Sequence, residues 1–174
     1  MKEDQRTRLS KQMLRNALIE LLKEKSINKI FVREICSKAE INRTTFYKYY
    51  GRPYDLMKDI ENTLYEELSH EVGDSKSCLM QTMRFIDKNA DTFRLLEKNN
   101  VDPMFPQKIQ NIPEIKEILE GVSKSEKFSG FGSYAYEFIV SGGYGVVRNW
   151  LNKERRESPE EIAEYLYTLF YSIK

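Results

Sequence analysis

The stretch that decides the fold runs from Ile30 to Tyr50 and reads IFVREICSKAEINRTTFYKYY. Its first half predicts a short amphipathic helix, because apolar residues recur there at helical spacing. These residues are Val32, Ile35, Cys36 and Ala39. Glu40-Ile41-Asn42 interrupts this helix, and the Asn42 side-chain oxygen can accept from a free amide of the next turn. A second short helix is expected from residue 43 to about residue 49, and two such helices joined by a three-residue turn are typical of a helix-turn-helix.

The second helix of this motif is rich in side chains that can bond phosphates or base edges. We expect an outward face made of Arg43, Thr44, Thr45, Tyr47, Lys48 and Tyr49. We expect the motif's own core to contain Ile35, Ala39, Ile41 and Phe46. A polar face that only meets solvent is the alternative interpretation. The basic charge around the motif favours contact with nucleic acid.

Charge is distributed unevenly along the 174 residues, although the whole chain carries only +1. Residues 1–53 hold 13 Lys and Arg against 6 Asp and Glu, a balance of +7, whereas residues 54–174 hold 15 against 21, a balance of −6. A basic first third therefore predicts that this end meets a polyanion. Lys2, Arg6 and Arg8 lie in a polar N-terminal segment that is either a frayed end or an arm touching phosphate or the minor groove.

The motif also carries a family resemblance. Val32-Arg33-Glu34-Ile35, Ala39-Glu40-Ile41-Asn42-Arg43 and Thr45-Phe46-Tyr47 resemble, in order and spacing, the DNA-binding segment of the TetR family of bacterial repressors. The sequence differs from the family's usual pattern in three places. Glu40 stands where the turn usually has Gly, Phe31 stands where a capping Thr is common, and Arg52-Pro53 replaces a small capping residue followed by Lys.

The resemblance implies which residues meet double-stranded DNA. Thr44 and Tyr47 are the expected base or adjacent backbone contacts, and Arg52 is the candidate replacement for the missing lysine phosphate contact. The full expected DNA-binding set is Arg33, Asn42, Arg43, Thr44, Thr45, Tyr47, Lys48, Tyr49 and Arg52.

The remaining chain reads as helices, so we expect an all-α fold. An N-terminal three-helix DNA-binding unit, residues 1–53, should be joined by a long helix to a helical regulatory and dimerisation body, residues 54–174. A first helix over Leu9–Lys25 should bury the stripe Leu14, Ala17, Leu18, Leu21 and Leu22. The long helix should start at Pro53 and run to about Val72, with Leu56, Ile60, Leu64 and Leu68 on one side. Ser158-Pro159-Glu160-Glu161 predicts a capped start for the last helix.

The last two helices carry more apolar surface than a body of this size needs, which predicts a homodimer. The first of them contains three glycines, each costing about 1 kcal/mol against Ala, so close approach of another backbone is expected there. A Gly-Gly-x-Gly patch before Trp-Leu also resembles the C-terminal region of a TetR subgroup. The expected interface is Gly142, Gly143, Val146, Trp150, Ile162, Leu166, Leu169 and Phe170. A monomer that buries both helices internally is the alternative.

The resemblance further implies a repressor that is released from a palindromic operator by a small apolar or aromatic effector. The expected pocket residues are Tyr65, Phe85, Phe93, Met104, Phe105, Tyr134 and Phe138. Ordinary core packing is the alternative for each of them. A DNA-bound adaptor or architectural protein of the same fold, with no effector, is the alternative function.

An enzyme is the least favoured class. His70 is the single histidine, and no phosphate loop or paired metal-binding motif accompanies it, so neither a catalytic residue, a cofactor nor a metal is expected. Only two cysteines are present, and no secretory or membrane-length apolar run appears, which predicts a cytoplasmic protein with reduced thiols.

Overall fold

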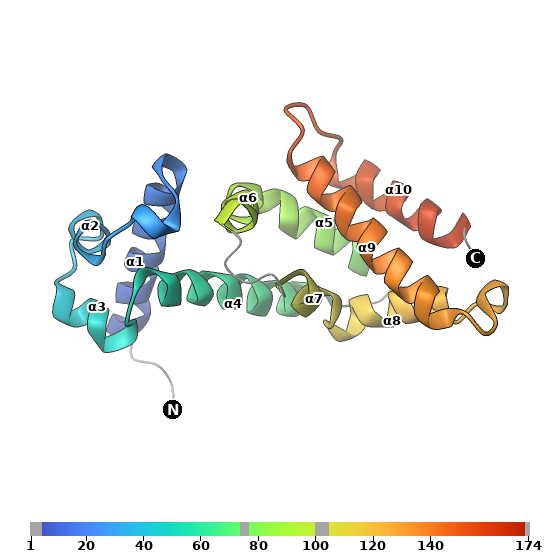
Figure 1. Cartoon of the computed structure of the whole chain (residues 1–174), viewed down its shortest axis with the longest axis horizontal. Coiled ribbons are helices and arrows are strands. Elements are labelled where there is room, and N and C mark those ends of the chain that lie inside the picture. Colours follow the sequence, from blue (N-terminus) through green and yellow to red (C-terminus); the bar gives the residue numbers. More distant parts are fainter. Residues whose placement is uncertain (1–4, 74–76, 100–104, 173–174) are drawn as a thin grey trace. The chain divides into compact units, whose positions relative to one another are not determined.

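The computed structural model describes residues 5–73, 77–99 and 105–172, and every regular element in these ranges is a helix (Figure 1). The all-α prediction is therefore confirmed. The helices are α1 (Gln5–Glu24), α2 (Val32–Lys38), α3 (Arg43–Tyr49), α4 (Pro53–Glu71), α5 (Cys78–Lys88), α6 (Ala90–Asn99), α7 (Phe105–Gln110), α8 (Pro113–Ser123), α9 (Gly132–Leu151) and α10 (Pro159–Ser172). Two short 3-10 turns, η1 (Ile27–Lys29) and η2 (Glu126–Phe128), complete them.

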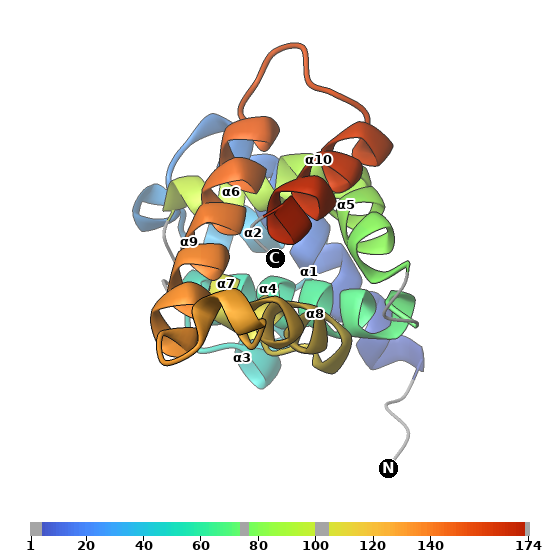
Figure 2. The same ribbon diagram turned by 90° about the vertical axis from the view of Figure 1, so that its right-hand side faces the viewer.

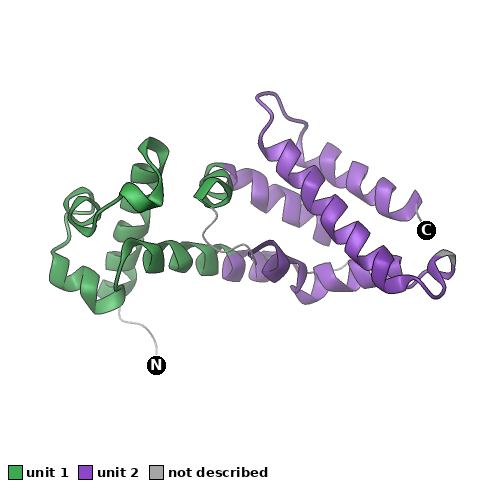
Figure 3. Cartoon of the chain, viewed as in Figure 1, with its two compact units in different colours: residues 1–64, 91–103 green, residues 65–90, 104–174 purple. Residues whose placement is uncertain are grey.

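The chain divides into two compact units (Figure 3). Unit 1 contains residues 1–64 and 91–103, and unit 2 contains residues 65–90 and 104–174. The division falls inside α4, so this helix belongs to both units. The expected functional boundary between residues 53 and 54 stays a prediction.

Unit 1 is built on α1, against which α2 and α3 pack side by side (Figure 1). The α1 stripe that was predicted from its spacing is buried in full. From α2 and α3, Ile35 and Phe46 reach this core with no exposed surface. Ile41, expected in the same core, is only half-buried because it lies in the turn between the two helices. The helix α1 also begins at Gln5, earlier than expected from its apolar residues.

A segment distant in sequence completes unit 1. The residues of α6 from Asp91 onward belong to it, and the backbone N–H of Ile27 donates to Oδ1 of Asn99 at 2.9 Å. Asn99 in turn donates through Nδ2 to the Leu95 carbonyl at 2.8 Å. The end of α6 is thus fixed against the turn that follows α1.

In unit 2, α10 packs along α5, and α9 packs along α8 (Figure 2). Trp150, at the end of α9, is almost fully buried, and its Nε1 donates to the Glu157 carbonyl at 2.8 Å. The Arg156 guanidinium lies 5.2 Å from the centre of the Trp150 ring and pairs with Asp87 of α5 at 2.6 Å. The connection between α9 and α10 is therefore held to both α9 and α5.

The predicted start of α10 is confirmed. Ser158 donates through its backbone N–H to Oε2 of Glu161 at 2.8 Å, and the Glu161 N–H donates back to the Ser158 hydroxyl at 3.2 Å. Pro159 occupies the first helical position, where its missing N–H would have had no partner. The Ser158 backbone N–H and the Ser158 hydroxyl, which also donates to Oε2 at 2.8 Å, hold the pKa of Glu161 below its usual value.

Candidate nucleic-acid interface

The turn between α2 and α3 is closed by backbone hydrogen bonds of the Schellman type. The Ile41 N–H donates to the Cys36 carbonyl at 3.0 Å, and the Glu40 N–H donates to the Ser37 carbonyl at 3.3 Å. Glu40 has a φ of 53°, in the left-handed region that usually favours glycine. The geometry of the turn is therefore kept without the glycine that the family usually has.

The start of α3 is capped as the sequence predicts. Oδ1 of Asn42 accepts from the backbone N–H of Thr45 at 2.8 Å. At the back of the helix, Phe46 is fully buried and meets the Tyr47 ring edge-on, with the ring centres 5.6 Å apart. The cap and the buried ring fix both the start and the rotation of this two-turn helix.

The face of α3 opposite Phe46 is open to solvent. Tyr47 exposes 58% of its surface, and Arg43, Thr44 and Lys48 are exposed beside it. Asn42 is exposed and Thr45 is half-buried. The arrangement brings hydroxyl groups, a guanidinium and an ammonium to one surface of a short helix, which suits bonding to phosphates and base edges.

Tyr49 lies differently from the other residues of the predicted set. It is half-buried, and its hydroxyl donates to Oγ1 of Thr7 at 3.2 Å. The ammonium groups of Lys11 and Lys48 lie 5.7 and 5.4 Å from the centre of its ring. Tyr49 thus holds the start of α1 to the end of α3 and gathers two positive charges around one aromatic ring.

Two arginines flank the α2–α3 motif. The Arg33 guanidinium lies 5.5 Å from the centre of the exposed Phe31 ring. Arg52 lies 5.4 Å from the Tyr54 ring and pairs with Asp55 at 3.3 Å, although its side chain stays 70% exposed. Asp55 also accepts from the backbone N–H groups of Gly51 and Arg52, so it caps the start of α4. Arg52 is therefore accessible, but a phosphate would compete with Asp55 for it.

The start of α2 lacks the usual capping hydroxyl, and Glu34 supplies half of a cap. Oε2 of Glu34 accepts from the Phe31 N–H at 2.9 Å. Two hydrogen-bond donors hold the pKa of Glu34 below its usual value. The Lys25 ammonium has the larger effect and the Phe31 N–H the smaller one. Burial raises the pKa of the Cys36 thiol on the apolar side of α2, which agrees with its expected role as a small core residue.

Sequence reasoning did not single out Thr7 and Lys11 as partners of the interface. Their spacing of four residues places them on one side of α1, but only the fold brings Tyr49 to that side. It also missed the contacts of Tyr50 and Asp59, which join α3 to α4.

The expected pocket residues differ in burial and in the unit to which they belong. Phe85 and Phe105 are buried in unit 2, and Tyr65 is half-buried, whereas Phe93 belongs to unit 1. Tyr134 and Phe138 expose 75% and 66% of their surface, which suits a contact surface on α9 better than the lining of an interior pocket. Met104 lies outside the described residues. The effector pocket stays a prediction.

The expected dimer residues separate into two groups. Trp150, Ile162, Leu166 and Phe170 are buried within the chain itself, where they form the core of unit 2. Gly142 is exposed, and Gly143, Val146 and Leu169 are half-buried. The second group is therefore still partly accessible at the surface of unit 2. Tyr134 and Phe138, expected in the pocket, belong to a larger set of exposed aromatic residues there. These are Phe131, Tyr134, Phe138, Tyr144, Tyr165, Tyr167 and Tyr171.

A family profile described as "Transcriptional regulator C-terminal region" of the TetR type matches residues 73–172, more than half of the chain. The chain belongs to the TetR family of transcriptional regulators. Among curated proteins, this TetR-family chain is 22% identical over 169 residues to the uncharacterized HTH-type transcriptional regulator YxbF of Bacillus subtilis strain 168. That match covers 90% of the chain and 43% of YxbF, so the chain spans less than half the length of this relative.

Two solved structures share the fold of the TetR-family chain. A TetR transcriptional regulator from Streptococcus agalactiae 2603V matches with a TM-score of 0.71 and 22% identity, covering 96% of both chains. The dihydroxyacetone kinase operon activator DhaS matches with a TM-score of 0.70 and 18% identity, covering 94% of both chains. The family match and these relatives are regulators of transcription and not enzymes.

Within residues 5–73, 77–99 and 105–172, no helix has both the length and the apolar character needed to cross a bilayer. Across the same ranges, no three side chains of His, Cys, Asp or Glu converge as metal ligands would.

Proposed function

We propose that this chain is a sequence-specific DNA-binding transcriptional regulator that places α3 in the major groove of duplex DNA. The observation that carries the proposal is the open polar face of α3, set against its buried reverse side. Arg43, Thr44, Tyr47 and Lys48 project outward, while Phe46 holds the helix in the core. A helix whose polar side chains are exposed and whose back is fixed can present them to base edges without first rearranging.

Phosphate contacts on either side of α3 would set the position of the helix along the duplex. The ammonium groups of Lys11 and Lys48 beside Tyr49 suit one such contact, since two neighbouring cations attract a phosphate oxygen. Arg33 at the start of α2 and Arg52 before α4 suit others. This set gives binding that depends strongly on salt.

A homodimer fits the surface of unit 2, and it would read two half-sites of a palindromic operator. Phe131, Tyr134 and Phe138 lie at spacings of three and four residues at the start of α9, so they share one exposed side of the helix. Further along, apart from the backbone of α9 and the adjacent residues, no described atom would lie within 4 Å of a Cβ on Gly142 or Gly145. Exposed aromatic side chains beside open glycines suit close packing of a second copy.

We further propose repression that is relieved by a small apolar or aromatic effector bound in unit 2. Phe85 and Phe105 supply buried aromatic surface there, and Tyr65 lies on α4, the helix shared by both units. An effector that prefers one conformation would change DNA affinity by its differential binding, typically about 1–3 kcal/mol. One structural neighbour is named an activator, so the sign of regulation has to be measured.

Selection of genomic fragments by the purified protein tests the DNA-binding proposal. We expect one enriched motif with two-fold symmetry, bound by the parent protein in gel-shift titrations. Absence of enrichment, or equal affinity for every fragment, would contradict sequence-specific regulation. A DNA-bound regulator of this kind would act in the cytoplasm.

A thermal-shift screen with apolar and aromatic metabolites tests the effector. A compound that raises the melting temperature and also releases the operator fragment would support the relieved repressor. Operator binding that no compound alters would instead favour an adaptor or architectural protein of the same fold.

A further inference from the structure

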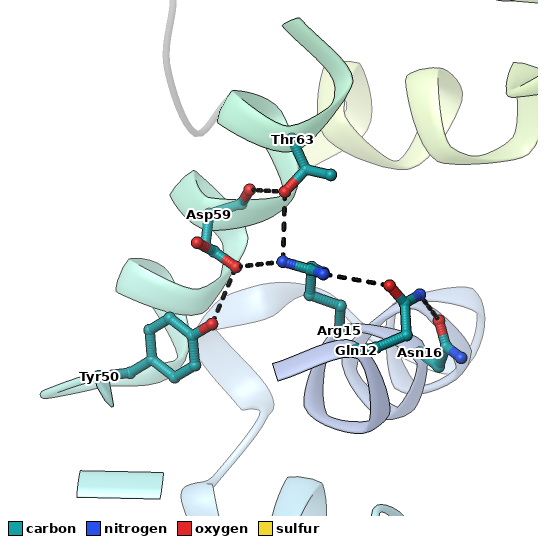
Figure 4. Close-up of polar contacts among 6 residues, drawn as sticks. All are labelled: Gln12, Arg15, Asn16, Tyr50, Asp59 and Thr63. Carbon is teal, nitrogen blue, oxygen red and sulfur yellow. Dashed lines mark hydrogen bonds and ion pairs between the residues drawn. The ribbon is translucent and has the colours of Figure 1, made fainter. Parts of the chain in front are cut away.

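One carboxylate oxygen in unit 1 joins three helices. Oδ2 of Asp59, on α4, accepts from the Tyr50 hydroxyl at 2.8 Å and from Nη1 of Arg15 at 2.9 Å (Figure 4). Tyr50 directly follows α3 and Arg15 belongs to α1. A single side chain of α4 therefore contacts both α1 and the end of α3.

The hydrogen bonds around this carboxylate also fix the direction of its partners. Nη1 of Arg15 donates to Oγ1 of Thr63 at 3.3 Å, and Nη2 donates to Oε1 of Gln12 at 3.1 Å. The Thr63 hydroxyl donates to the Asp59 carbonyl at 2.8 Å. Arg15 therefore bonds both to its own helix and to α4, and its side chain is only 13% exposed. Charge-assisted hydrogen bonds that are partly shielded from water are the stronger ones.

The link matters most for α3, because a helix of seven residues has little stability of its own. Asn42 fixes its start and Phe46 its rotation, while Tyr50 fixes its end. Tyr50 is buried, and its backbone N–H donates to the Phe46 carbonyl at 2.9 Å. Losing the hydroxyl contact would remove the hydrogen bond that ties the end of α3 to α4.

We propose that Asp59 is the positioning residue through which α4 sets the orientation of α3, and that this orientation controls operator affinity. Tyr50 carries the effect to α3, and Arg15 keeps the Asp59 carboxylate aimed at it. The proposal rests on the proposed DNA-binding function. Asp59, Tyr50 and Arg15 would then act in recognition indirectly. The Tyr50 hydroxyl and the Asp59 carboxylate are directed at each other and not at the exposed face of α3.

The test compares Tyr50→Phe, which removes one oxygen, with Asp59→Asn, which removes the charge at nearly constant shape. Asp91→Asn is the matched control, since Asp91 is an exposed carboxylate of unit 1 that pairs only with a neighbour on its own helix among the ion pairs described. Operator affinity is measured by fluorescence anisotropy at a temperature where circular dichroism shows each variant fully folded. Amide hydrogen exchange of α3 is measured in parallel, with α5 and α10 as internal references.

We expect each variant to bind the operator about tenfold more weakly, the size of effect usual for losing one hydrogen bond to a charged group. The double variant should be little weaker than either single variant, because both remove the same link. Exchange of the α3 amides should be faster, while exchange in α5 and α10 and the behaviour of Asp91→Asn should match the parent.

Parent-level operator affinity in both variants would overturn the proposal, whatever the exchange rates. A lower melting temperature with unchanged affinity would show a role in stability alone. If the parent protein binds no DNA fragment, the proposed function fails separately. In that case faster α3 exchange in the variants would still support Asp59 as the residue that holds α3, and unchanged exchange would overturn it.

Discussion

The ring of Phe170 lies 3.1 Å from the place that a Cβ on Gly143 would occupy. Gly143 is on α9 and Phe170 is on α10, so this glycine allows a buried ring to approach the α9 backbone. At the neighbouring Gly142 and Gly145, no described atom lies within 4 Å of the corresponding position apart from the backbone of α9 and the adjacent residues. Packing within the single chain therefore explains the need for glycine at position 143. It does not explain Gly142 and Gly145, which face open space.

Alanine substitutions separate these two cases. Gly142→Ala should gain about 1 kcal/mol of helix propensity in the isolated chain, but it should weaken the dimer if a second copy packs closely there. Gly143→Ala makes the same gain and loses about 1–3 kcal/mol by displacing the Phe170 ring, so it should be no more stable than the parent. Sedimentation equilibrium gives the dimer dissociation constant, and thermal denaturation at several concentrations gives the stability. A more stable Gly142→Ala protein with an unchanged dissociation constant would exclude this side of α9 as the interface.

Replacing Glu40 by glycine should stabilise the protein. A side chain in the left-handed region costs roughly 1–2 kcal/mol, and glycine removes this cost. Glycine also gives the unfolded chain more conformational entropy, which offsets part of the benefit, so a net gain of about 0.5–1 kcal/mol is expected. Urea denaturation followed by circular dichroism measures it. Glu40→Ala is the control, because it removes the charge and keeps the strain. If Glu40→Ala stabilises as much as Glu40→Gly, charge repulsion and not backbone conformation is the cause.

The elements of this fold were predictable wherever local signals decide them. The α1 stripe from Leu14 to Leu22, the Asn42 cap and the start of α10 at Pro159 follow from spacing and capping chemistry, and the structure contains all three. Contacts between distant residues were not predictable in this way. Tyr49 was expected to bond phosphate, yet its hydroxyl reaches Thr7, because the direction of a side chain depends on which helix packs beside it.

The same limit explains the aromatic residues of unit 2. Helical spacing identifies an apolar side of a helix, but it does not say whether that side meets the chain's own core or a partner. Trp150 was expected at an interface and is buried in the chain, whereas Tyr134 was expected in a pocket and is exposed. Unit 1 also contains part of α6, a placement that no periodicity in the sequence indicates.

Tyr47→Ala should weaken operator binding without loss of helix content. Tyr47 is 58% exposed and touches the core only through the edge of its ring against Phe46, so removing it should cost contacts to DNA and leave the helices intact. A good contact to a base is worth about 1–3 kcal/mol, which corresponds to a tenfold or larger loss of affinity. Gel-shift titration measures the loss, and far-ultraviolet circular dichroism checks the fold. Tyr47→Phe separates the hydroxyl from the ring, and parent-level affinity in both variants would remove Tyr47 from the recognition surface.

Stability should decrease in acid partly through the cap of α10. The pKa of Glu161 is lowered by hydrogen bonds from the Ser158 backbone N–H and hydroxyl. A carboxyl whose pKa is lower in the folded state stabilises the fold above its unfolded pKa, and this contribution is lost as pH falls through the folded value. Glu161→Gln should therefore flatten the decline of melting temperature below about pH 5 relative to the parent. An unchanged pH profile would show that the cap has no electrostatic contribution.

Operator binding should weaken steeply with salt, and Lys48 should account for part of the dependence. Each phosphate neutralised by a cation contributes about −0.9 to the slope of log affinity against log salt concentration. Lys48→Ala should make the slope shallower by roughly one, since its ammonium lies exposed on α3 beside the Tyr49 ring. Lys88→Ala, which removes an exposed lysine from α5 in unit 2, should keep the parent slope. Fluorescence anisotropy at several salt concentrations gives all three slopes. Equal slopes for the parent protein and Lys48→Ala would show that Lys48 does not contact phosphate, and a slope near zero in the parent would contradict binding through the basic surface of unit 1.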